Sequence, residues 1–249
     1  MALASPANNW NSIDSNEVFW WEAVFPWAEA DPESLLQWQE AVLAVGDRTG
    51  IYRVESIDRM GYRRQRDGYI GDFIREHSDL IPREDLHLPR GFVCDVLDPN
   101  MRNPAVACTM LSYADEKGDV AETWVRDMGQ LAHMVGHEFG YPYQPLEIAA
   151  EGGSESLPGL QRVSVILATS TDIWFPWNSP MGRGGVPRDE PLDNRVLSRL
   201  NGARLNAFLG EVREATLAAG GAWTCAPWRE ERQVNEFGVV LDAPKPARV

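Results

Sequence analysis

The sequence predicts an α+β protein in which a mixed or mainly antiparallel sheet is packed by three to four helices. Segments with helical and with extended patterns alternate irregularly along the chain, and a turn-forming stretch at 98–104 separates two strand-like segments as in a hairpin. The glycine-rich motifs of nucleotide-binding folds are missing, as is the G-x-S-x-G motif of acyl transfer. With 249 residues and 44% hydrophobic content, we expect a single globular domain at 16–242 between flexible tails at 1–15 and 243–249.

The first half of the chain begins with the aromatic segment 18–25, which precedes Pro26 and is interpreted as a short helix. Asp31, Pro32 and Glu33 form a strong helix start, because Asp is a good N-cap and Pro suits the first helical position. That helix is expected to end at Gly46. The remaining expected elements are a helix at 69–77 and strands at 50–57, 91–97 and 105–113.

In the second half, Asp119 and Glu122 have the spacing of a capping box, so we expect a helix from there to about Glu138. The segment 160–175 is the most strand-like of the chain. A last helix is expected at 204–219, ended by Gly220 and Gly221. Short strands are expected at 222–225 and 239–241.

The charge of the chain restricts its partners. The 23 basic and 37 acidic residues give a net charge of −14, which argues against binding to nucleic acids or anionic membranes. A basic protein is the partner that such a charge favours. The start of the chain lacks the pattern of a signal peptide and its longest apolar run, 163–168, is too short to cross a bilayer, so we expect a cytoplasmic protein.

Two histidines four residues apart, His133 and His137, are the candidate metal ligands. Zinc proteases use this spacing on a helix, but in H-E-x-x-H order, and here Tyr141 stands where the second histidine would follow His137. Helical periodicity places both histidines opposite the apolar face that contains Met128 and Leu131. We therefore expect solvent-facing histidines, no metal and no cofactor.

The three cysteines are too few and too widely spaced for a disulfide framework. If the expected hairpin is symmetric about Met101, Cys94 lies opposite Cys108, with Cβ atoms ~5 Å apart. A reversible disulfide or half of a metal site is one interpretation of this pair. Two small buried apolar residues are the other, and the one that we favour.

The candidate binding site lies around a glycine- and proline-rich segment, 176–191, which follows the strongest strand pattern. Its prolines lack N–H donors, so we expect a mobile surface loop, cut first by trypsin at Arg183 or Arg188. The ten tryptophans are either core residues or exposed contacts, and Trp177 at the base of this loop is the preferred contact. The candidate residues are Asp172, Trp174, Trp177, Arg183, Asp193 and Arg195.

Three stretches of the last third resemble uncharacterised hypothetical proteins of actinobacteria: residues 171–176, 193–195 and 204–209. The bias to arginine, with lysine only at positions 117 and 245, fits a GC-rich bacterial origin. The resemblance implies no activity and no functional residue.

Two functions remain open from the sequence. The first is a non-enzymatic protein-binding module of the immunity or antitoxin kind, which would sequester a basic partner through an acidic, tryptophan-bearing surface. The alternative is a small-molecule enzyme or ligand-binding protein with a pocket beside the 176–191 loop.

Overall fold

The structure is a computed structural model of the 249-residue chain. It describes residues 19–26, 32–58, 80–82, 105–136, 144–151, 162–169, 171–178, 191–227 and 233–245. The expected helix at 69–77 and the expected strand at 91–97 lie outside these residues.

The described residues form two four-stranded antiparallel sheets and three α-helices, which confirms the α+β prediction. The first sheet has the strand order β10–β1–β7–β6. Its strands are β1 (Phe19–Pro26), β6 (Glu147–Glu151), β7 (Arg162–Thr169) and β10 (Ala222–Pro227). The first of the described strands, β1, therefore lies inside the sheet, between two strands from the second half of the sequence.

The second sheet has the order β3–β2–β4–β5. Its strands are β2 (Tyr52–Asp58), β3 (Leu80–Pro82), β4 (Ala105–Ala114) and β5 (Val120–Val125). Two short antiparallel pairs complete the described strands: β8 (Trp177–Asn178) with β9 (Leu192–Asp193), and β11 (Val234–Asn235) with β12 (Gly238–Val239).

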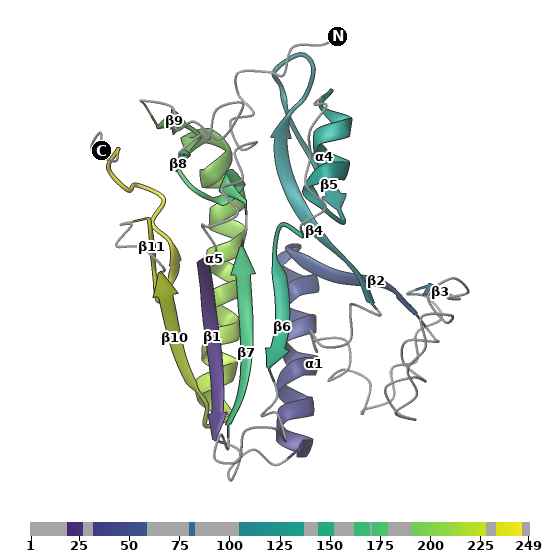
Figure 1. The fold of residues 1–249 in the computed structure, drawn as a ribbon, viewed down its shortest axis with the longest axis vertical. Coiled ribbons are helices and arrows are strands. Elements are labelled where there is room, and N and C mark those ends of the chain that lie inside the picture. The colour runs from purple at the N-terminus through teal and green to yellow at the C-terminus, as the bar shows by residue number, and fades with distance from the viewer. Residues whose placement is uncertain are drawn as a thin grey trace.

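Two long helices connect the sheets. Figure 1 shows α5 (Arg195–Ala218) behind the first sheet, with α1 (Pro32–Thr49) beside it. The helix α5 packs against α1, β10 and β4, so it contacts both sheets. One continuous hydrophobic cluster accordingly contains residues of each sheet, such as Trp21 and Leu111, which are both fully buried.

The segment predicted to be a helix at 18–25 is the strand β1, so that prediction is wrong. Alternate side chains of β1 are buried, and those between them are half-buried. The buried set is Phe19, Trp21, Ala23 and Phe25. This period of two is the pattern of a strand with one face in the core, and it outweighs the effect of Pro26.

The helix predicted from Asp119 to Glu138 is also wrong in its first half. The chain makes a hairpin turn at 115–119, with Gly118 at φ +85°, and continues as β5. The helix α4 (Met128–Met134) begins only after Asp127, whose carboxylate accepts the N–H of Gln130 at 2.8 Å. The capping Asp and its Gln partner therefore stand eight residues later than predicted.

Other predicted elements are confirmed with changed bounds. The helix that starts at Asp31–Glu33 runs three residues beyond Gly46, and the predicted strand 160–175 ends at Thr169, before the 3-10 turn η4 (Asp172–Trp174). The last helix begins at Arg195 rather than 204. Its end is as predicted: Gly220 has φ +77°, and the N–H groups of Gly220 and Gly221 bond to the carbonyls of Leu217 and Thr216.

Polar side chains that are buried (Ser198, Asn201) or half-buried (Asn206) attach α5 to its neighbours. The amide of Asn201 exchanges two hydrogen bonds with the backbone of Ser112 in β4, and that of Asn206 does the same with Val239 in β12. The Ser198 hydroxyl donates to the Trp174 carbonyl at 2.8 Å. These contacts satisfy backbone groups that would otherwise be buried without partners.

Candidate functional site

Hydrogen bonds to its backbone hold Trp177 in place. It pairs with Asp193 in the β8–β9 ladder, which ties together the two ends of the segment 176–191. The side-chain amide of Gln233 lies against the same residue: it accepts the Trp177 N–H at 3.0 Å and donates to the Trp177 carbonyl at 3.0 Å. Gln233 is 6% exposed, so this amide takes the place of a neighbouring strand.

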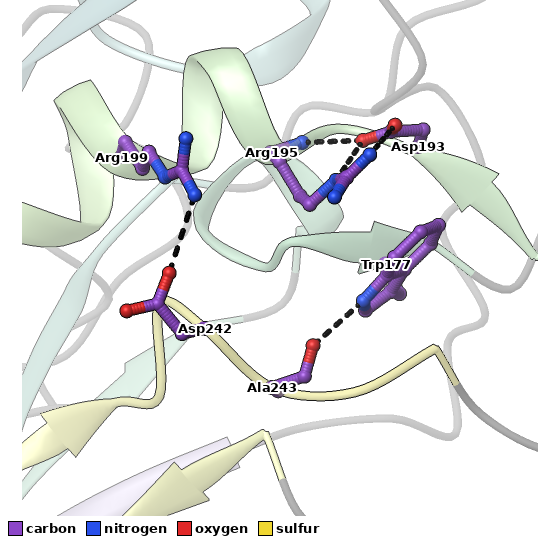
Figure 2. A network of polar contacts seen from close by, with 6 residues as sticks. All are labelled: Trp177, Asp193, Arg195, Arg199, Asp242 and Ala243. Atoms are coloured by element: carbon purple, nitrogen blue, oxygen red, sulfur yellow. Dashed lines mark hydrogen bonds and ion pairs between the residues drawn. The ribbon is translucent and has the colours of Figure 1, made fainter.

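The indole ring of Trp177 is half-buried and lies near two cations (Figure 2 shows the arginine). The guanidinium carbon of Arg195 lies 4.9 Å from the ring centroid, and the ammonium of Lys245 lies 5.8 Å from it. The indole N–H donates to the carbonyl of Ala243 at 2.8 Å. Ala243 is the first residue of the expected C-terminal tail, and it is buried.

Asp193 orients Arg195 over that ring. The two side chains form a two-pronged ion pair, with N–O distances of 2.9 and 2.6 Å. The same carboxylate accepts the backbone N–H of Arg195, the first residue of α5. The hydrogen bonds from Arg195 lower the pKa of Asp193, and the carboxylate in turn raises the pKa of Arg195.

A second ion pair joins α5 to the C-terminal segment. Arg199 donates to Asp242 at 3.2 Å, and both side chains are mostly exposed (Figure 2). One turn further along α5, Gly202 lies so close to Leu241 that a Cβ atom at Gly202 would lie 2.7 Å from a Leu241 methyl. We call the group formed by Trp177, Asp193, Arg195, Gln233, Ala243 and Lys245 the Trp177 surface.

Of the six candidate residues, the structure brings Trp177, Asp193 and Arg195 together. Trp174 is instead fully buried, and its indole N–H donates to the Pro145 carbonyl at 2.9 Å, so it is a core residue. Asp172 begins the turn η4, where its backbone carbonyl faces the amide of Asn194. Arg183, like residues 179–190 as a whole, lies outside the described residues.

The tryptophans that the structure describes divide between core and surface, which the sequence left open. Trp21, Trp38 and Trp174 are buried, whereas Trp20, Trp124, Trp177 and Trp223 are half-buried. Trp223 resembles Trp177 in one respect: its indole N–H donates to a backbone carbonyl of the C-terminal segment, that of Glu236, at 2.9 Å.

A second polar cluster lies on the second sheet. The guanidinium of Arg53 stacks on Trp124 at 4.0 Å, and Glu55 pairs with Arg53 at 3.0 Å and with Arg126 at 3.7 Å. Burial and a hydrogen bond to Glu55 raise the pKa of the Cys108 thiol to about 12. Although burial opposes it, the hydrogen bonds from Cys108 and Arg53 lower the pKa of Glu55.

Cys108 lies opposite Arg53 in the β2–β4 ladder and is buried. Cys94 lies outside the described residues, so the proposed pairing of the two cysteines stays a prediction. A thiol with so high a pKa remains protonated at neutral pH and is a poor nucleophile. The geometry of Cys108 therefore fits the interpretation of a small buried side chain.

His133 is exposed on α4, as predicted. His137 lies outside the described residues. Within the part of the chain that the structure describes, no three His, Cys, Asp or Glu side chains are grouped as ligands for a metal ion. None of the described helices is both long and apolar enough to cross a membrane.

Sequence reasoning missed Gln233, Ala243 and Lys245. Gln233 gave no signal, because one amide in a polar stretch has no periodicity. The signal at Ala243 was the alternation Ala-Pro-Lys-Pro at 243–246, which favours an extended backbone and which we interpreted as a tail. Comparisons of the chain with protein-family models, with curated proteins and with solved structures give no match.

Proposed function

We propose that the chain is a non-enzymatic protein-binding module of the immunity or antitoxin kind, which contacts a basic partner through the Trp177 surface. The observation that carries this proposal is the fixed Trp177–Arg195 pair. Tryptophan and arginine are enriched among residues that dominate binding energy, because both combine a large apolar area with directional hydrogen bonding.

Pre-organisation supports the proposal. The Gln233 amide holds the backbone of Trp177 with two hydrogen bonds, and Asp193 holds the guanidinium of Arg195 with two more. Groups that are already held in one conformation lose little conformational entropy when a partner binds. With 48% of its side chain exposed, Arg195 remains accessible.

The charge of the chain supports a basic partner. A net charge of −14 steers a basic protein toward the chain and raises the rate of association at low salt. Once the partner is near, the fixed Trp177 and Arg195 supply the local contacts. The two effects are separable, because salt screens the first and leaves the second largely unchanged.

The test is affinity capture from a lysate of the source organism with the wild-type chain and with Arg195→Ala. We expect one stoichiometric basic protein, with retention reduced about tenfold or more by the substitution. The matched control is Arg213→Ala, because Arg213 also stacks on a ring, at 5.2 Å from Phe237, and also pairs with a carboxylate, that of Glu214.

Recovery of no stoichiometric protein contradicts the proposal, as does equal retention by the two variants. Native mass spectrometry of the chain purified from its host distinguishes the protein-binding module from the alternative, an enzyme or ligand-binding protein. A bound small molecule in place of a protein partner would favour an enzyme or ligand-binding protein.

A further inference from the structure

The C-terminal segment contacts Trp177 in the manner of a bound peptide. The Ala243 carbonyl accepts the indole N–H at 2.8 Å, and the ammonium of Lys245 lies 5.8 Å from the centroid of the ring. Pro244, between them, is exposed. Extended proline-rich segments dock on aromatic side chains, and here the Ala243 carbonyl and the Lys245 cation are the groups that contact the indole.

The sequence of this segment favours such docking. Pro244 and Pro246 restrict Ala243 and Lys245, which precede them, to extended conformations. An extended proline-rich strand has little conformational entropy left to lose when it docks. The segment is also basic in an acidic chain, because Lys245 and Arg248 are its charged residues beyond Asp242.

The attachment of the C-terminal segment weakens along its length. Residues 233–240 are held firmly by the Gln233 amide, the Asn206 amide and the β11–β12 ladder. Residues 241–245 lie outside these strands and are held by a turn hydrogen bond from Ala243 to Val240, by Leu241 against Gly202, by the exposed Arg199–Asp242 pair and by the contacts with Trp177. Pro244 and Lys245 are exposed, so residues 243–245 can detach while the β11–β12 anchor stays in place.

We propose that Trp177 is a binding site for short basic proline-rich peptides of the type Ala-Pro-Lys-Pro, and that the chain's own residues 243–245 occupy it as an internal ligand. This inference rests on the proposed function and names the partner segment that the Trp177 surface takes. A partner binds by displacing the internal segment. The segment therefore weakens the apparent affinity for the partner, because a tethered ligand competes at an effective concentration of about a millimolar.

The test uses the full-length chain with Pro244→Gly and Lys245→Ala, labelled with 15N so that each indole N–H gives an NMR signal. The Trp177 signal is assigned with Trp177→Phe. In the double variant we expect this signal to shift and to exchange faster with solvent, because the carbonyl of Ala243 no longer stays on it. A synthetic peptide of residues 241–249, Leu-Asp-Ala-Pro-Lys-Pro-Ala-Arg-Val, should restore the wild-type position.

Two controls make the result specific. The Trp223 indole, which donates to the Glu236 carbonyl in the same C-terminal segment, should not move. A peptide with both prolines and the lysine replaced by alanine should bind roughly fivefold more weakly or worse. If the double variant fails to fold, the fluorinated wild-type peptide is titrated into the wild-type chain and into Trp177→Phe, and only the first should bind.

The proposal is overturned if the Trp177 signal is unchanged in the double variant, or if millimolar peptide does not restore it. In the titration with the fluorinated peptide, equal binding to both chains overturns it. Failure here is distinct from failure of the proposed function. If a partner is captured through Arg195 but the peptide does not bind, the proposed function holds and the peptide site is rejected. If the peptide binds but no partner is captured, the peptide site holds and the proposed function is rejected.

Discussion

Asn201 in α5 replaces a missing strand beside Ser112 in β4. Its Oδ1 accepts the Ser112 N–H at 2.7 Å and its Nδ2 donates to the Ser112 carbonyl at 3.0 Å. The ladder between β2 and β4 extends only to Thr109, so β4 continues past its neighbour and the helix supplies the hydrogen bonds. Both residues are fully buried, so water cannot take over these bonds.

We therefore expect Asn201→Ala to lower the free energy of unfolding by about 2–4 kcal/mol, because it leaves a donor and an acceptor buried without partners. Urea denaturation measures the change. The exposed substitution Glu214→Ala in the same helix is the control and should alter stability by no more than about 0.5 kcal/mol. Equal effects of the two substitutions would show that Asn201 does not support β4.

Two glycines of α5 make a matched pair. A Cβ atom at Gly202 would lie 2.7 Å from Leu241 and 3.1 Å from the Trp174 carbonyl, whereas one at Gly210 would meet nothing within 4 Å. We expect Gly210→Ala to stabilise the chain by about 0.5–1 kcal/mol, since alanine loses less backbone entropy in a helix. Gly202→Ala should destabilise it by about 1–3 kcal/mol through overpacking. Thermal unfolding of both variants distinguishes the two, and a stabilising Gly202→Ala would contradict the close packing of Leu241.

Asp193 should make the free energy of unfolding depend on pH in the acidic range. Hydrogen bonds from Arg195 lower its folded pKa, so its contribution is present above the unfolded pKa of about 3.9 and is lost as the pH falls through the folded pKa. The carboxylate is half exposed, so we expect Asp193→Asn to cost no more than about 1 kcal/mol near neutral pH. The difference from wild type should shrink toward about pH 2.

Urea denaturation at several pH values checks this expectation. Asp242→Asn is the control, because its 86% exposed carboxylate pairs with Arg199 on the same side of the molecule, and its effect should be smaller. A difference for Asp193→Asn that grows on acidification would mean that the Arg195 pair does not favour the ionised form.

Cys108 should resist alkylation in the folded chain. Burial and the Glu55 hydrogen bond raise its pKa to about 12, so the thiolate is scarce at neutral pH. Burial also raises the pKa of Cys225, but that side chain is half-buried and reagent reaches it more easily. We expect iodoacetamide to modify Cys225 well before Cys108, as measured by peptide mass spectrometry, and this order to vanish in urea. Prior modification of Cys108 would indicate that the cluster with Glu55 is open to solvent.

The limits of the sequence reasoning have physical causes. The segment 18–25 was interpreted from Pro26, although the alternation of buried Phe19, Trp21, Ala23 and Phe25 carried the information. The half-buried face of β1 carries Trp20 and Val24 beside Glu22, and these apolar residues conceal the period of two. The start of α5 was missed because Ser198, Asn201 and Gly202 share its buried face with Leu197, which leaves the apolar period incomplete.

Trp177, Asp193 and Arg195 were predicted together because they flank one unusual segment. Their partners were not, because Gln233 and Ala243 lie more than 50 residues from Trp177 and act through one amide and one backbone carbonyl. Contacts of this kind depend on tertiary placement, which local patterns do not contain.

The position of β1 has a consequence for biosynthesis. Its two neighbours are residues 162–169 and 222–227, and the Trp21 indole also bonds to the carbonyl of Asn235. A ribosome adds β1 well before either partner, and residue 227 must emerge before β1 is paired on both sides. Until then β1 offers an aromatic, hydrogen-bonding edge to other nascent chains, so premature termination should yield aggregates rather than shorter folded products.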